Sequence, residues 1–217
     1  MITEPTVIKE RPILFSPAMV KAILDGRKTQ TRRVVKGAAL EWLAADMFTP
    51  EFVALQENYL CPYGYPGDRL WVRETFYVQE SIWEKDRGLQ PIHYRADITD
   101  PWEVEDYFLK PSIHMPRWAS RLTLEITKIR VERLQEISEE DAKAEGVRFT
   151  DFGDDYGYMK QQKPGFHVGE VSSYEECHGT AKTCFGGLWE TIHAKDGMGW
   201  EKNPWVWVIQ FRVVQKP

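Results

Sequence analysis

The sequence contains no long apolar run. None of its stretches approaches the roughly 20 consecutive apolar residues that a membrane-spanning helix needs. Its first twelve residues, MITEPTVIKERP, also lack the apolar centre of a signal peptide. We therefore expect a cytoplasmic protein without a membrane partner, long enough at 217 residues to bury one core or two small ones.

Cysteine is scarce as well. The three cysteines, Cys61, Cys177 and Cys184, are an odd number spread unevenly along the chain, which favours reduced thiols over a disulfide framework. Cys177 and Cys184 could join His178 and His167 at a zinc ion, but their spacing fits none of the usual paired-ligand patterns. We predict no metal and no other cofactor.

Several catalytic and charge signatures are missing. The sequence has no GxxxxGK[ST], GxGxxG, HExxH or GxSxG motif. Its 33 acidic residues outnumber 28 basic ones, and the net charge of −5 disfavours a non-specific duplex binder, since such proteins depend on neutralising phosphates. A local basic site is still open, because the first 40 residues hold 8 basic and only 3 acidic residues.

The basic residues concentrate at Gly26–Arg33, with the sequence GRKTQTRR. This stretch holds four cations, two threonines and no acid, so it creates a local positive field. A helix is expected just before it, from about Pro17 to Asp25, because Ser16 is a good N-cap and Gly26 a good C-terminal cap. The dipole of that helix accounts for Arg27, and a solvated basic helix end is the alternative for the whole stretch.

Alternating apolar residues predict most of the fold. The pattern favours strands in five segments and a short helix that follows Ser138 and ends near Glu145, without a βαβ rhythm. A slip in the alternation at Thr127-Lys128 predicts a bulge or bend. We predict an α+β, mostly β fold built as a small barrel. It would be one domain over residues 1–217, with insertions near 37–65, 77–118 and 148–184. The strand segments are 13–15, 69–76, 92–96, 120–134 and 205–213.

Lys28 and Thr31 are the residues of the basic stretch that suggest chemistry. A threonine hydroxyl becomes a nucleophile when a base removes its proton, and a lysine amine is such a base only when its pKa is lowered. Nearby arginines can lower it through like-charge repulsion. Residues three apart point to opposite faces of a straight strand, so the pair requires a bend between them.

Aromatic side chains offer a second kind of site. Trp71 and Tyr94 are candidates for stacking on a nucleobase, because aromatic faces bind bases with little sequence demand. Core packing is the alternative for each of them, since the chain has nine tryptophans and nine tyrosines.

Four segments together resemble the ASCH domain. They are the GRKTQTRR stretch, the Gly67-Asp68 turn, the segment Val131–Val147 and the closing strand Trp205–Phe211. Over its full length the chain looks like the larger ASCH proteins of bacteriophages and prophages, and its GRKTxTxR core is similar to that of small bacterial N4-acetylcytidine amidohydrolases. The resemblance implies a PUA-like β-barrel.

The resemblance also implies roles for individual residues. By motif position Lys28 matches the proton acceptor, Thr31 the nucleophile and Glu145, in Ala-Glu-Gly, the proton donor of those amidohydrolases. Arg33 matches the arginine two residues beyond the threonine, and we place it with Arg32, Trp71 and Tyr94 among the candidate substrate-binding residues. The three long insertions have no counterpart in the small enzymes.

The function expected on these grounds is hydrolysis of N4-acylated cytidine to cytidine and a carboxylic acid by a monomer acting on a modified nucleoside. In a variant of this mechanism Lys28 activates water directly and Thr31 only orients it. Two other functions remain open: a PUA-like module that binds RNA without chemistry, and a metal-independent ribonuclease.

Overall fold

The computed structural model describes residues 8–45, 47–79, 92–151, 164–171 and 177–215. Parts of the predicted insertions at 77–118 and 148–184, and residues 1–7 of the amino-terminal segment, lie outside the described residues. The chain divides into two compact units. Unit 1 contains Met1–Leu24, Pro62–Lys128 and Phe211–Pro217, and unit 2 contains Asp25–Cys61 and Ile129–Gln210.

The described strands confirm the α+β class. They form sheets of five, three and two strands, and each sheet has two edge strands, so the predicted closure into a small barrel is not seen among them. The long strands β7 (Thr123–Arg133) and β10 (Trp205–Gln215) contribute residues to both units. No helix within the described residues is long and apolar enough to cross a membrane.

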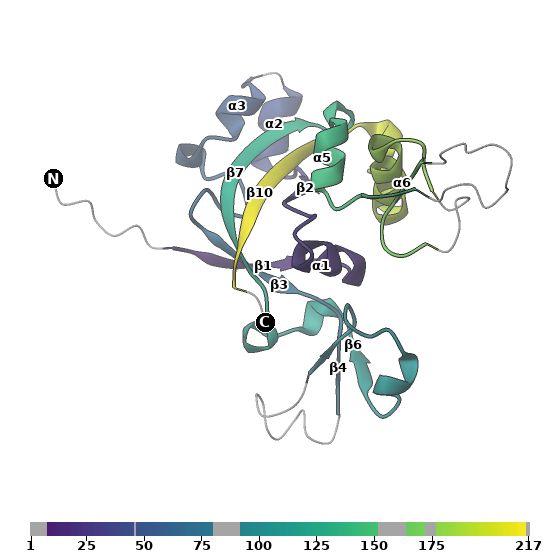
Figure 1. The fold of residues 1–217 in the computed structure, drawn as a ribbon. Helices are drawn as coiled ribbons and strands as arrows, with labels where there is room; N and C mark the ends of the chain where they lie inside the picture. Colours follow the sequence, from purple (N-terminus) through teal and green to yellow (C-terminus); the bar gives the residue numbers. More distant parts are fainter. Residues whose placement is uncertain (1–7, 46, 80–91, 152–163, 172–176, 216–217) are drawn as a thin grey trace, which may run out of the picture. The chain divides into compact units, whose positions relative to one another are not determined.

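Unit 1 contains a parallel and an antiparallel strand pair around β3. Strand β3 pairs in parallel with β1 and antiparallel with the first residues of β7, and Figure 1 shows β1 and β3 side by side. Leu70 and Val72 are buried on one face of β3, as the alternation predicts. The predicted strand 69–76 is divided at Glu74 into β3 and β4, and the helix expected from Pro17 is confirmed. The elements of this unit, apart from the long strands, are β1 (Glu10–Leu14), α1 (Pro17–Leu24), β3 (Arg69–Arg73), β4 (Phe76–Val78), β5 (His93–Tyr94), η2 (Pro101–Val104), β6 (Phe108–Lys110), η3 (Ser112–His114) and η4 (Arg117–Ala119).

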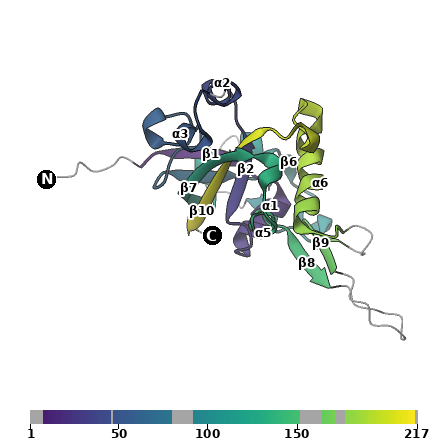
Figure 2. The ribbon, with the colours of Figure 1, turned by 90° about the horizontal axis from the view of Figure 1, so that it is seen from above.

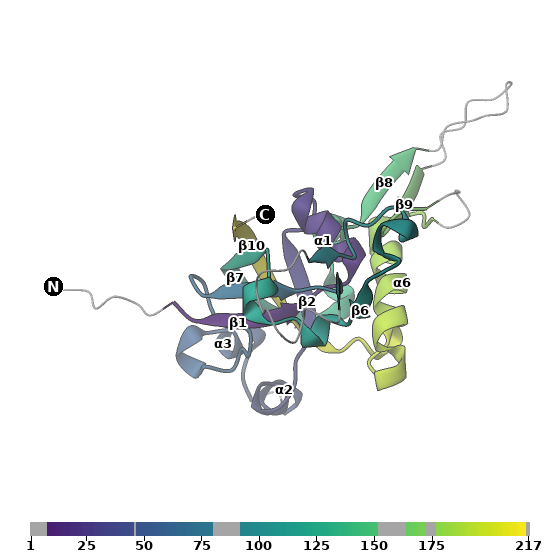
Figure 3. The same cartoon turned by 90° about the horizontal axis from the view of Figure 1, so that it is seen from below.

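Unit 2 is built around β2, which pairs antiparallel with β10. Helix α5 lies next to α6 in Figure 1. The hairpin of β8 and β9 lies beside one end of α6 in Figures 2 and 3, where Phe166 also pairs with His178. The elements are β2 (Gln30–Val34), α2 (Ala38–Ala44), α3 (Pro50–Val53), η1 (Gln56–Asn58), η5 (Leu134–Glu136), α5 (Glu139–Ala144), β8 (Arg148–Asp151), β9 (Pro164–His167), α6 (Ala181–His193), η7 (Ala194–Asp196) and η8 (Trp200–Lys202).

Two of the predicted irregular features take a definite form. The exposure pattern of β7 breaks at Thr127 and Lys128, whose neighbouring side chains are both exposed, although the strand itself is continuous. In the predicted insertion at 37–65, Trp42 of α2 packs its ring 4.6 Å from Phe48, which stacks on Phe52 of α3 at 4.8 Å. This second segment is therefore ordered by an aromatic cluster.

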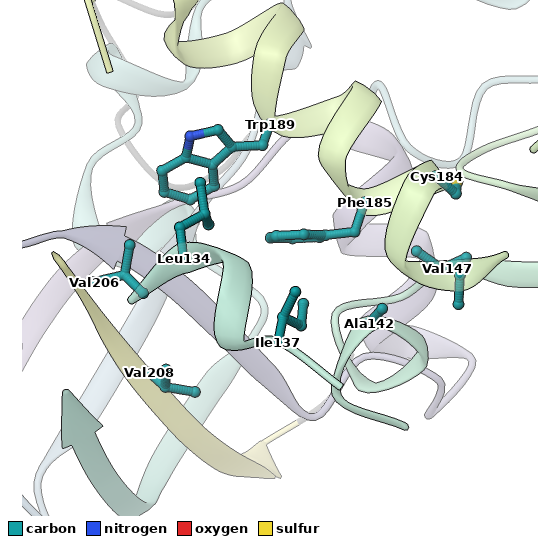
Figure 4. Packing of buried hydrophobic residues seen from close by; sticks show 10 residues of the cluster. Leu134, Ile137, Ala142, Val147, Cys184, Phe185, Trp189, Val206 and Val208 are labelled. Atoms are coloured by element: carbon teal, nitrogen blue, oxygen red, sulfur yellow. The ribbon is translucent and has the colours of Figure 1, made fainter. Parts of the chain in front are cut away.

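Helix α6 supplies much of the core of unit 2. Phe185 and Trp189 extend from α6 over Ile137 and Leu134, as Figure 4 shows. The sequence predicted only a short helix near Leu188, whereas α6 has 13 residues and begins after a Thr180 N-cap. The core cluster contains Leu134, Ile137, Ala142, Val147, Ala181, Cys184, Phe185, Trp189, Val206 and Val208.

Candidate active site

Lys28 reaches the candidate site because the chain before β2 runs antiparallel to the end of α5. Gly26 has φ of 77°, a left-handed conformation that glycine adopts without strain. Beyond it, Lys28 and Glu145 form an isolated antiparallel bridge, and the Thr29 amide donates to the Ala144 carbonyl over 2.9 Å. Residues 117 positions apart in the sequence are thereby brought together.

Glu145 is placed by the end of α5. Ser138 caps this helix by accepting a hydrogen bond from the Asp141 amide, as predicted, and Glu145 is the C-cap residue. Gly146 follows with φ of 102° and turns the chain away from the helix axis. The short helix predicted from the sequence therefore ends where it was expected, with the carboxylate at its last turn.

Lys28 and Glu145 form a buried ion pair. The Lys28 Nζ donates to the Glu145 Oε2 over 2.7 Å and to the Glu145 backbone carbonyl over 2.8 Å, and each residue is only 3% exposed. Burial lowers the pKa of the Lys28 amine. The Glu145 carboxylate opposes this effect, while Arg33 and Arg32 lower the pKa further by repulsion. The Lys28 amine therefore loses its proton more readily than the amine of a lysine in water.

Arg32 is engaged at all three guanidinium nitrogens. Its Nη1 donates to the Glu145 Oε1 over 3.0 Å, its Nε to the Glu132 Oε1 over 3.1 Å and its Nη2 to the Asp141 Oδ2 over 2.9 Å. The side chain is 0% exposed. Burial lowers the pKa of this guanidinium, but the three carboxylates, Glu145 first, raise it above its ordinary value. Arg32 therefore stays charged.

Arg130 completes what we call the ion-pair network. Its Nε donates to the Glu132 Oε2 over 2.8 Å, and its Nη2 donates to Asp141. The network contains three cations and three carboxylates: Lys28, Arg32, Arg130, Glu132, Asp141 and Glu145.

Thr31 is buried on β2, where it is paired with Ile209 of β10. Alternation along the strand places its side chain on the face opposite to that of Arg32, which binds the same carboxylate as Lys28. The role of Thr31 as nucleophile stays a prediction. Arg33 is half-buried and lies within electrostatic reach of Lys28, and its substrate-binding role also stays a prediction.

Trp71 and Tyr94 lie in unit 1, whereas the ion-pair network lies in unit 2. The guanidinium carbons of Arg73 and Arg117 are 5.6 Å and 5.9 Å from the Trp71 ring centroid. The Tyr94 hydroxyl donates to the Ala119 carbonyl over 3.0 Å. Their substrate-binding roles stay predictions.

Three residues of the ion-pair network were not predicted from the sequence as site residues: Arg130, Glu132 and Asp141. Their ion pairs depend on which strands and helices become neighbours, and the sequence does not show this. The only local signal was weak: Arg130 and Glu132 flank the apolar Val131 on a predicted strand, which places both on one face.

His167, His178 and Cys184, which the sequence offered as zinc ligands, lie close together in unit 2. The Nε2 of His167 lies 2.8 Å from the Thr150 hydroxyl and its Nδ1 lies 2.9 Å from the Gly169 carbonyl. Burial raises the pKa of the Cys184 thiol to about 12. These two residues and His178 line an open pocket of about 400 Å³. No cluster of three or more metal-ligating side chains is found in the described part of the chain.

Comparisons of the chain with protein-family models, with curated proteins and with solved structures find no match.

Proposed function

We propose that this protein is an amidohydrolase that removes the acyl group from N4-acylated cytidine. The observation that carries the proposal is the buried contact of 2.7 Å between the Lys28 Nζ and the Glu145 Oε2. It joins two groups that can accept and donate a proton. The substrate class, like the expected PUA-like barrel, rests on the resemblance of the GRKTQTRR stretch and the Ala-Glu-Gly segment to the ASCH amidohydrolases.

Amide hydrolysis needs a base for the nucleophile and an acid for the departing amine. The hydrogen bond between the Lys28 Nζ and the Glu145 Oε2 gives a path along which a proton can pass between the two groups. Burial lowers the pKa of the Lys28 amine, which makes it easier for this amine to lose its proton and act as the base. In the proposed reaction Glu145 carries the proton that the departing amine requires.

In the proposed reaction the Lys28 amine takes the proton of the Thr31 hydroxyl as its oxygen bonds to the acyl carbon. This step requires the Thr31 hydroxyl to approach Lys28 from the face of β2 opposite to that of Arg32. Glu145 gives its proton to N4 as the carbon–nitrogen bond breaks, so cytidine leaves with a neutral amino group. Water then hydrolyses the threonyl ester and releases the carboxylic acid. Arg33, which lies within electrostatic reach of Lys28, or a nearby backbone amide stabilises the negative oxygen of the intermediate.

The direct test is turnover of N4-acetylcytidine, followed by the change in ultraviolet absorbance when cytidine forms. We expect turnover by the unaltered protein and its loss in Lys28→Ala and Glu145→Gln. Arg212→Gln is the matched control, because Arg212 makes an exposed ion pair with Glu125 in unit 1. Folded protein that fails to hydrolyse any N4-acylated cytosine derivative contradicts the proposal.

The role of Thr31 has its own test. Mass spectrometry of protein quenched during turnover is expected to show an acyl group on Thr31, and Thr31→Ala is expected to lose it. Turnover by Thr31→Ala without any acyl-protein would favour the variant mechanism, in which Lys28 activates water directly.

A second candidate function is RNA binding. It is favoured by the Trp71 ring in unit 1, which has the guanidinium groups of Arg73 and Arg117 within 6 Å of its centroid. Such a set can stack on a base and bind its phosphate. Salt-sensitive binding of single-stranded RNA that Trp71→Ala weakens, without turnover of acylated cytidine, would support this function. Cleavage of that RNA would indicate the ribonuclease.

A further inference from the structure

Glu145 divides its two carboxylate oxygens between two cations. The Oε2 accepts from the Lys28 Nζ over 2.7 Å, while the Oε1 accepts from the Arg32 Nη1 over 3.0 Å. The Glu145 side chain is 4% exposed, so water does not compete for these positions. The orientation of the carboxylate, and with it the distance to Lys28, depends on where Arg32 is held.

Arg32 is itself held by groups other than Glu145. Glu132 accepts from its Nε and Asp141 from its Nη2 over 2.9 Å, and both of these carboxylates also bind Arg130. Asp141 is fixed in turn by the first turn of α5. The guanidinium is planar and rigid, so contacts on its other two nitrogens determine where its Nη1 points.

Arg32 is also closed off from any ligand. Its side chain is 0% exposed, and its guanidinium carbon lies 5.8 Å from the centroid of the Phe185 ring of α6. Each guanidinium nitrogen already donates to a carboxylate. A substrate-binding role for Arg32 would require this network to open.

We propose that Arg32 is a positioning residue: anchored by Glu132 and Asp141, it binds the Glu145 Oε1 and thereby holds the carboxylate so that its Oε2 faces Lys28. This inference rests on the proposed function, in which Lys28 and Glu145 exchange a proton. Arg32 acts in two ways. It fixes the geometry of the pair, and its permanent positive charge makes protons in the site easier to release.

The kinetic consequence separates positioning from substrate binding. Because Arg32 does not touch the substrate, Arg32→Lys should lower kcat by about 10²-fold, the usual effect of a misplaced catalytic group, and leave KM unchanged. Lysine keeps the charge but has one nitrogen in place of the three-nitrogen fork. A raised KM with unchanged kcat would overturn the positioning role.

A second measurement does not depend on activity. The titration of the Lys28 amine is followed by NMR of ¹³C-labelled lysine and assigned with Lys28→Arg. Removing one positive charge in Arg32→Gln should shift this titration to higher pH, with Glu145, Glu132, Asp141, Arg33 and Arg130 left in place around it. Arg212→Gln, at an exposed pair, should leave it unchanged.

Glu132→Gln serves where Arg32→Gln does not fold. It removes an anchor of Arg32 at the outer part of the network, where Glu132 is 15% exposed, and should lower kcat in the same direction by a smaller factor. A protein with no turnover of acylated cytidine but with the NMR shift would refute the function and keep the positioning of Lys28 and Glu145 by Arg32. An unchanged NMR titration and unchanged kcat in these variants would refute the positioning role alone.

Discussion

Lys28 and Glu145, 117 positions apart, form a buried ion pair of 2.7 Å. Each residue is only 3% exposed, so water does little to solvate either charged group. Taking two charges out of water is expensive, and such pairs add little net stability even when they are well formed. Net stability therefore does not account for these buried charges, and the proton exchange that we propose would give them a role.

Removing one partner of this pair should be costly. Lys28→Met leaves the Glu145 carboxylate buried with Arg32 alone, so we expect the free energy of unfolding to fall by about 3 kcal/mol, the lower end of the range for broken buried pairs. Arg212→Met, which breaks an exposed pair with Glu125, should cost about 1 kcal/mol or less. Urea unfolding at neutral pH measures both. Equal losses in the two variants would contradict the prediction.

The lowered pKa of Lys28 predicts a pH dependence of stability. Between that lowered value and the ordinary 10.5, the unfolded chain holds a proton on Lys28 that the folded protein has lost. Unfolding takes up protons in this window, so the free energy of unfolding should rise with pH until about 10.5, relative to Lys28→Met. Urea unfolding between pH 7.5 and 10.5 gives the difference between the two proteins.

Arg33→Gln provides the check on this pH dependence. Arg33 lowers the pKa of Lys28 by repulsion, so its loss should narrow the window and flatten the rise. A difference between the unaltered protein and Lys28→Met that falls as the pH rises would mean that the pKa of Lys28 is raised instead.

The parts of the fold that local rules determine were predictable. Helix α1 was found from Ser16 and Gly26 at its two ends, and α5 from its Ser138 cap. Such signals act within a few residues, so neighbours in the sequence are sufficient to reveal them. The alternation of β3, β7 and β10 was visible for the same reason. Which strands pair, and whether they close into a barrel, depends on residues distant in the sequence.

The site was predictable only in part. Lys28 and Glu145 were named together only because the segments that hold them resemble those of a known family, and no local pattern would join two residues so far apart. Arg32 was assigned to a substrate, although its side chain is 0% exposed among three carboxylates, because the sequence shows its charge but not its burial. Arg130 and Glu132 were missed because strand register decides their contacts.

The first half of helix α6 was missed in the sequence because it contains Gly186. Gly186 disfavours a helix, yet a Cβ at this position would lie 3.2 Å from the Trp200 ring, so packing requires the glycine. In Gly186→Ala the gain in helix propensity of about 1 kcal/mol should be outweighed by overpacking of about 1–3 kcal/mol. We expect a lower free energy of unfolding, measured in urea.

Trp200→Leu tests the cause of that loss. In this background the ring is absent, so Gly186→Ala should cost less than it does in the unaltered protein, and the pair of substitutions should show a coupling energy. An alanine that stabilises the unaltered protein would show that Trp200 moves aside freely.

Glu74 and Arg121 form a buried ion pair in unit 1, and the effect of pH on the stability that depends on Glu74 should be opposite to that of Lys28. Arg121 donates to both Glu74 oxygens, over 2.9 Å and 3.0 Å, and the Glu74 side chain is 1% exposed. Burial raises the pKa of Glu74, and Arg121 restrains that rise. Arg121→Met should therefore raise the pKa of Glu74 further and, by leaving a buried charge unpaired, lower the free energy of unfolding at pH 7 by about 3–5 kcal/mol.

Acid should restore part of the stability that Arg121→Met loses. Between the ordinary value of 4.5 and its raised pKa, Glu74 holds a proton in the folded protein that the unfolded chain has released, so the free energy of unfolding falls as the pH rises through this window. The window is wider in Arg121→Met, and its deficit relative to the unaltered protein should shrink from pH 7 to pH 5 in urea unfolding. In the exposed-pair variant Arg212→Met, the free energy of unfolding should change with pH as it does in the unaltered protein, since the Arg212 side chain is 66% exposed. A deficit of Arg121→Met that stays constant with pH would show that Glu74 remains ionised without its arginine.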